Sequence, residues 1–151
     1  MSDATSIPGN DPNKATGFVG GVVANVTVLP GAVLTPLTGA NAGKAGLALA
    51  SAFQTACVMG LAVSGAEAGD VTSYQFSNVL TLTTAQWDAV NADSSSTGLT
   101  PGAYYYASGA SAGKMTKTGT GGGGIFSVPI GLALTTTQMQ VLPQAPVLTS
   151  S

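Results

Sequence analysis

The chain has 151 residues and is 44% hydrophobic, yet only 7% of its residues are charged and it contains no histidine. Ordinary soluble domains carry about 25% charged residues, and most catalytic sites need side chains that titrate, bind a metal or hold a phosphate. The hydrophobicity excludes a disordered chain, and four basic residues are too few for the positive patch of a nucleic-acid-binding protein.

The N-terminal segment, residues 1–16, is polar and contains two prolines. It lacks the basic and apolar regions of a signal peptide, so we expect no signal peptide and a flexible N-terminal arm there. Residues 17–34 carry no charge, but several glycines, Asn25 and Pro30 interrupt them. Because a spanning helix needs about 20 mainly apolar residues, we expect no membrane segment.

After this arm, short apolar runs alternate with turn residues. Many of the runs are rich in β-branched and aromatic side chains, which favour strands, and Pro30-Gly31 is typical of a turn. Residues 39–46 are predicted as a loop, and residues 47–53 fit a strand or a helical turn. The runs that we expect to form strands are residues 22–29, 32–37, 56–63, 71–82, 103–107, 114–118, 125–134 and 138–142.

Two places in this pattern make more specific predictions. Residues 83–87 predict one short helix, for which Thr84 can supply the N-cap. Trp87 and Val90 lie three residues apart and therefore share one helix face. Pro129 lies within a predicted strand and cannot donate a ladder hydrogen bond, so we expect a sheet edge or a β-bulge there.

Many short strands with almost no helix predict an all-β fold, a small antiparallel β-barrel or sandwich with one short helix and flexible N- and C-terminal arms. The barrel or sandwich domain is expected over residues 17–142, and an extended C-terminal tail over residues 143–151. Residues 59–63 and 130–134 each place a glycine between apolar residues. A β-bulge or close approach of another backbone explains a glycine in a strand, and both chance similarity and two related strands lining one barrel stay open.

The residues that could carry chemistry are few and scattered. Glu67 and Asp70 flank Gly69 in a predicted turn, which is typical of a solvated hairpin tip. Cys57 has no histidine to activate it as a nucleophile, and the glycine run at 119–124 lacks the Lys-Ser/Thr of a phosphate-binding loop. We therefore expect no enzyme activity, no metal site and no cofactor.

Three consecutive tyrosines lie in the strand predicted over residues 103–107. Successive side chains of a strand alternate between its faces, so Tyr104 and Tyr106 share one face and Tyr105 lies on the other. We expect two of the three rings to enter the core or an interface, and Tyr105 to be the exposed aromatic residue.

Several sequence segments match a known kind of module. They include Thr-Thr-Ala-Gln-Trp-Asp-Ala-Val at 83–90, Gly-Leu-Thr-Pro-Gly-Ala-Tyr-Tyr-Tyr at 98–106 and Val-Pro-Ile-Gly-Leu-Ala-Leu at 128–134. With these segments the chain resembles, from residue 56 onward, the small β-rich modules of tailed-bacteriophage virions found in capsid decoration (cement) proteins, head fibres and some tail-associated proteins. The resemblance implies a symmetric assembly, a homotrimer, on the outside of a phage head, and it supplies no catalytic residues.

The resulting expectation is a virion structural protein, made in the host cytoplasm without a signal peptide. It binds the major capsid protein on the outer surface of the head and stabilises the shell by mass action, with no nucleic-acid or membrane partner. Candidate subunit or capsid contacts are Phe18, Val22 and Val26, in an uncharged apolar stretch.

Two other functions were weighed. A carbohydrate-binding adhesin module of a head or tail fibre would stack sugars on Tyr105 and Trp87, so exposure of these rings favours it and burial of both counts against it. An enzyme would need Glu67 and Asp70 to converge with Asp88 or Asp93 in a cleft.

Overall fold

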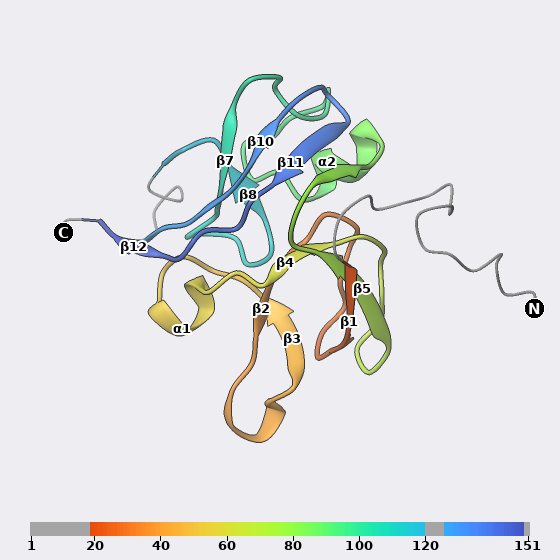
Figure 1. The fold of residues 1–151 in the computed structure, drawn as a ribbon, viewed down its shortest axis with the longest axis vertical. Helices are drawn as coiled ribbons and strands as arrows, with labels where there is room; N and C mark the ends of the chain where they lie inside the picture. The colour runs from red at the N-terminus through yellow and green to blue at the C-terminus, as the bar shows by residue number, and fades with distance from the viewer. Residues whose placement is uncertain (1–18, 120–125, 150–151) are drawn as a thin grey trace, which may run out of the picture.

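The computed structural model describes residues 19–119 and 126–149. In this part of the chain, twelve strands and two short α-helices give the all-β fold expected from the sequence. The strands form a closed five-stranded barrel, a five-stranded sheet and a two-stranded ribbon (Figure 1). The N-terminal arm predicted over residues 1–16 and the candidate contact Phe18 lie outside the described residues, as does most of the glycine run.

The N-terminal half of the described chain forms the barrel. Around it the strands are β1 (Val19–Ala24), β3 (Lys44–Leu47), β2 (Val33–Pro36), β4 (Gly60–Ala62) and β5 (Val71–Gln75). Strand β1 is parallel to β3 and antiparallel to β5, while the remaining neighbours pair antiparallel. The sheet closes on itself, so these five strands present no free edge to solvent.

Strand β3 lies partly in the segment predicted as a loop. Its sequence, Lys-Ala-Gly-Leu, contains no β-branched residue, but Ala45 pairs with Ala24 of β1 on one side and with Pro36 of β2 on the other. Gly46 is needed for the packing, because a Cβ there would lie 2.8 Å from the Leu37 side chain. Pairing with two neighbours, rather than local propensity, makes this segment a strand.

The C-terminal half forms the second sheet. Its strands, in spatial order, are β6 (Val79–Thr81), β11 (Gln138–Val141), β10 (Pro129–Ala133), β7 (Tyr104–Ala107) and β8 (Met115–Thr116). The pairing of β10 with β7 shifts register between Pro129 and Gly131, so the predicted bulge is confirmed. The edge position that Pro129 also allowed is wrong, because β10 lies inside the sheet.

The two similar glycine-containing segments lie in different sheets, so the idea that they line one barrel is wrong. Each glycine nevertheless has the same packing role. A Cβ on Gly60 of β4 would lie 2.6 Å from the Gln75 carbonyl oxygen, and one on Gly131 of β10 would lie 2.5 Å from the Gln140 carbonyl oxygen. Close approach of a neighbouring backbone, the predicted reason for glycine at these positions, is confirmed.

Helix α2 (Thr84–Ala89) lies between β6 and β7, two strands of the second sheet. Thr83, in an extended conformation, is the N-cap, and it exchanges hydrogen bonds with Gln86 in a capping box. The predicted cap, Thr84, is therefore one residue too late and is the first helical residue. Trp87 and Val90 are both buried, as their shared helix face predicts.

One hydrophobic core connects the barrel and the sheet. It contains Leu34 and Leu61 from the barrel and Ile130 from the sheet. Gly31, in the turn before β2, has a φ of 83°, and a Cβ there would lie 3.4 Å from the Trp87 ring. The indole of α2 thus fills the junction between the two halves.

Two further elements differ from expectation. Helix α1 (Phe53–Ala56) is a second short helix where the sequence predicted one helix in all. The segment after residue 142 is extended, but Gln144 N–H donates to the Pro129 carbonyl oxygen and β12 (Val147–Leu148) pairs with β9 (Phe126–Ser127). It therefore packs on the body of the protein rather than forming a free arm.

Candidate functional site

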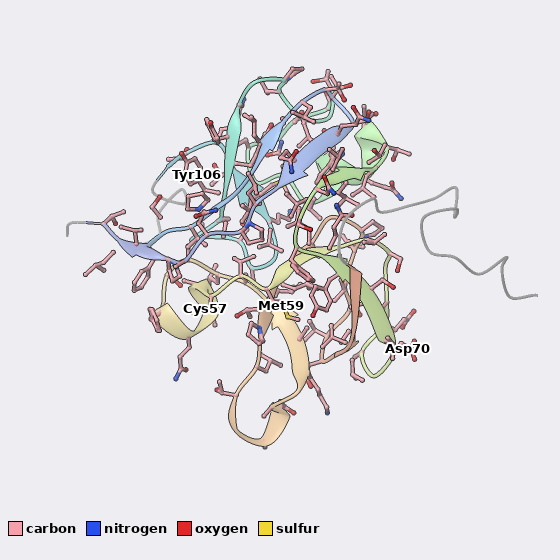
Figure 2. All side chains as sticks on the ribbon, viewed as in Figure 1. Cys57, Met59, Asp70 and Tyr106 are labelled. Atoms are coloured by element: carbon pink, nitrogen blue, oxygen red, sulfur yellow. The ribbon has the colours of Figure 1, made fainter. Side chains whose placement is uncertain are left out.

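The acidic residues do not gather. Glu67 and Asp70 are exposed in the turn between β4 and β5 of the barrel, whereas Asp88 belongs to α2. Asp88 accepts a hydrogen bond from Gly98 N–H at 2.8 Å, which fastens a loop. Figure 2 shows Asp70 at the end of the barrel far from Tyr106. Across residues 19–119 and 126–149, no three cysteine or acidic side chains come together in a way that could hold a metal ion.

Asp93 also has a structural role, because its carboxylate accepts hydrogen bonds from another segment of the fold. Its carboxylate accepts from the Thr116 hydroxyl at 2.6 Å and from Lys117 N–H at 2.8 Å. The Lys117 ammonium in turn donates to the Thr100 hydroxyl at 3.2 Å. These contacts tie the segment after α2 to strand β8.

Replacing Asp93 with alanine is expected to lower the free energy of unfolding by about 1–3 kcal/mol, because the Thr116 hydroxyl and Lys117 N–H lose a charged acceptor. Urea-induced unfolding measures the change. Asp70→Ala is the matched control in an exposed turn and is expected to change stability by less than about 0.5 kcal/mol. Equal effects of the two substitutions would contradict this role for Asp93.

Cys57 is half-buried and lies directly after α1. Its thiol donates to the Phe53 carbonyl oxygen at 3.3 Å, and it is one of the labelled residues in Figure 2. The contact belongs to the end of the helix and brings no base to the sulfur.

The prediction that Tyr105 is exposed is wrong. Tyr105 is fully buried, and its hydroxyl accepts a hydrogen bond from Thr100 N–H at 2.9 Å. Tyr104 is the exposed ring, with 60% of its surface accessible, and Tyr106 is half-buried. The physical reason is that the face carrying Tyr105 packs on the core, where the hydroxyl still finds a donor.

A sequence signal for this orientation exists. Ala103 and Ala107 share the strand face of Tyr105, so small apolar side chains flank this ring on its own face. Tyr104, Tyr106 and Ser108 lie on the opposite face. The small apolar neighbours mark the inward face.

Trp87 is also fully buried and donates its indole N–H to the Thr137 carbonyl oxygen at 2.8 Å. Burial of both rings counts against the adhesin module built on them.

The barrel carries one set of exposed apolar side chains. Of the predicted contacts, Val26 is 37% exposed, in the segment after β1, while Val22 is half-buried against the core. Leu29 and Val71 are also exposed on the barrel, and Val71 lies opposite Val23 in the β1–β5 pair. We call Val26, Leu29 and Val71 the barrel surface.

A second apolar surface lies where α1 meets the ribbon of β9 and β12, and sequence reasoning missed it. Phe53 of α1 is 60% exposed, and its ring centroid lies 6.0 Å from that of Phe126. Phe126 pairs with Leu148, which is 68% exposed. Because paired residues of an antiparallel ladder lie on one face, Leu148 lies beside Phe126. Phe126 itself is buried, with 9% of its surface accessible, so the exposed side chains Phe53 and Leu148 both adjoin a buried ring. We call Phe53, Phe126 and Leu148 the ribbon surface.

No family model matches this chain, and no curated protein sequence matches it. Within the described segments, no helix is long and apolar enough to cross a membrane. The structure therefore presents exposed apolar side chains on the barrel and on the ribbon, among other positions, while the carboxylates of Asp88 and Asp93 accept hydrogen bonds that fasten loops.

Proposed function

We propose that this chain is a virion structural protein, a capsid decoration (cement) protein that binds the outer surface of a phage head and stabilises it. The observation that supports the proposal most is the exposure of large apolar side chains on both the barrel and the ribbon of a protein with few charges. Exposed apolar patches of this kind are typical of sites that other proteins cover.

The segments that resemble phage virion modules also belong together in space. Those at 98–106 and 128–134 contribute the neighbouring strands β7 and β10, and the one at 83–90 forms α2. The indole of Trp87 bonds to the turn that follows β10. The resemblance thus concerns one packed unit rather than scattered short matches.

The mechanism is mass action. A protein that binds the assembled shell more tightly than its separated subunits stabilises the shell by its binding free energy. Repetition of the same contact over symmetric sites multiplies that effect. The barrel surface, together with the half-buried Val22, supplies the contacts assigned to the major capsid protein, and copies of the chain form a homotrimer.

The test uses undecorated heads of the phage whose genome carries this coding sequence. Added full-length protein is expected to cosediment with the heads saturably and to raise the temperature at which the heads lose their DNA or disassemble. Val26→Gln is expected to weaken binding about 10-fold, since interface contacts of moderate strength contribute about this much. Leu134→Gln, at a residue of similar exposure outside the barrel, is the control and should leave binding unchanged. Heads that bind nothing at micromolar protein would refute the proposal.

A further inference from the structure

We propose that copies of this chain meet through the ribbon surface, the face formed by Phe53, Phe126 and Leu148. The inference rests on the proposed function in that it names the contact between subunits of the decoration oligomer. It differs from the expectation drawn from the sequence, which gave Phe18, Val22 and Val26 as subunit or capsid contacts.

The ribbon surface has the construction of a subunit contact. The Phe126 backbone N–H donates to the Ala50 carbonyl oxygen at 3.1 Å, which anchors β9 to the segment before α1. The Phe53 ring then packs on Phe126 at a tilt of 59°, leaving most of its own surface in water. Leu148 extends the apolar area across the ribbon from β9 to β12. Backbone hydrogen bonds and the ring contact therefore place both exposed side chains next to Phe126.

Charge indicates which partner this surface fits. The described segments that build it, residues 45–66 and 126–149, contain no aspartate, glutamate, lysine or arginine. A partner that presented charged groups here would lose their hydration without gaining an ion pair. A second ribbon surface brings no such groups, and in a closed symmetric assembly each copy contributes the same residues around the axis.

The ribbon surface alone is smaller than a stable interface between subunits. A stable interface covers about 800 Å² on each partner, which is more than three side chains provide. The residues flanking Phe53, namely Ser51, Ala52 and Gln54, are exposed and uncharged, so the contact can extend along the segment around α1. The exposed apolar area around Phe53 therefore continues into uncharged residues of the same segment.

The position of the ribbon surface leaves the capsid contact free. In Figure 1, α1 and β12 lie on the left of the molecule, whereas β1 and β5 of the barrel lie on the right. Subunits joined through α1 and the ribbon would keep the β1–β5 side of each barrel available for the shell. One surface then holds the copies together, and the other holds the assembly on the head.

Sedimentation velocity of the full chain over a range of concentrations tests the assignment. The double variant Phe53→Gln/Leu148→Gln is expected to raise the dissociation constant of the oligomer by about 100-fold or more, since two central contacts are lost. The control Tyr104→Gln/Leu134→Gln removes two exposed side chains that lie outside both surfaces, with 60% and 44% of their surface accessible, and should leave self-association unchanged. The conservative variant Phe53→Leu/Leu148→Met should retain it. Circular dichroism shows that each variant is folded.

A monomeric wild-type chain at micromolar concentration would overturn the inference, and so would equal dissociation of both glutamine variants. Head binding separates this result from the proposed function. If the ribbon variant stays oligomeric while the wild-type chain binds heads, the inference fails and the function stands. If the ribbon variant dissociates but the wild-type chain ignores heads, the inference stands and the function fails.

Discussion

Replacing Trp87 with alanine is expected to lower the free energy of unfolding by about 3–5 kcal/mol, the usual cost of removing a large aromatic side chain from a core. The indole is fully buried, lies against Gly31 of the barrel segment and bonds to Thr137 of the second sheet. Its loss opens a cavity at the junction of the two halves, where neither half alone can collapse to fill it. Because whole domains are stable by only about 5–15 kcal/mol, the variant should be largely unfolded at moderate urea concentrations.

Trp87→Phe separates the cavity from the hydrogen bond. The Thr137 carbonyl oxygen also accepts from Leu82 N–H, so loss of the indole N–H leaves it with a partner. The phenylalanine variant is therefore expected to lose only about 1–2 kcal/mol, from the unfilled volume. Urea titrations followed by circular dichroism measure both variants. A loss below about 1 kcal/mol for Trp87→Ala would show that the two halves do not share a core.

Replacing Gly131 with alanine is expected to destabilise the protein by about 1–3 kcal/mol although it adds one methyl group. The new Cβ would lie 2.5 Å from the Gln140 carbonyl oxygen and 2.8 Å from the Met139 sulfur. The oxygen belongs to the neighbouring strand β11, so relief requires β10 and β11 to move apart. The methionine side chain can move, but the backbone cannot do so without weakening the ladder.

Gly21→Ala is the matched control in another strand. A Cβ on Gly21 meets only the Val71 side chain, at an ordinary contact distance of 3.5 Å. Because glycine in a strand costs about 0.5–1 kcal/mol relative to alanine, this variant should be neutral or slightly more stable. Unfolding midpoints of the two variants in urea give the comparison. If Gly131→Ala were as stable as Gly21→Ala, the close approach at β10 would not matter for stability.

The features that could be predicted from the sequence depend on local chemistry. Runs of β-branched residues predicted strands, the missing N–H of Pro129 predicted its bulge, and the three-residue spacing of Trp87 and Val90 predicted a shared buried face. Each of these follows from a property of a few neighbouring residues, whatever the rest of the chain does.

The features that could not be predicted depend on pairing between distant residues. Strand β3 exists because it lies between β1 and β2, and its own residues do not favour a strand. The ribbon surface requires Phe126 to pair with Leu148 and also to contact Phe53. Phe53 precedes Phe126 by 73 residues in the sequence (126 − 53). Periodicity within a short window contains no information on such contacts. Of the contacts predicted from the sequence, Val26 is exposed and Val22 is half-buried, and their role as contacts stays a prediction.

Electron cryomicroscopy of the intact virion tests the central proposal most directly. We expect density for this fold on the outer surface of the head, repeated at symmetry-related positions, with the barrel facing the major capsid protein and α1 and β12 facing neighbouring copies. A well-resolved virion map whose every outer density belongs to other proteins, together with absence of the chain from the purified particles by mass spectrometry, would contradict it.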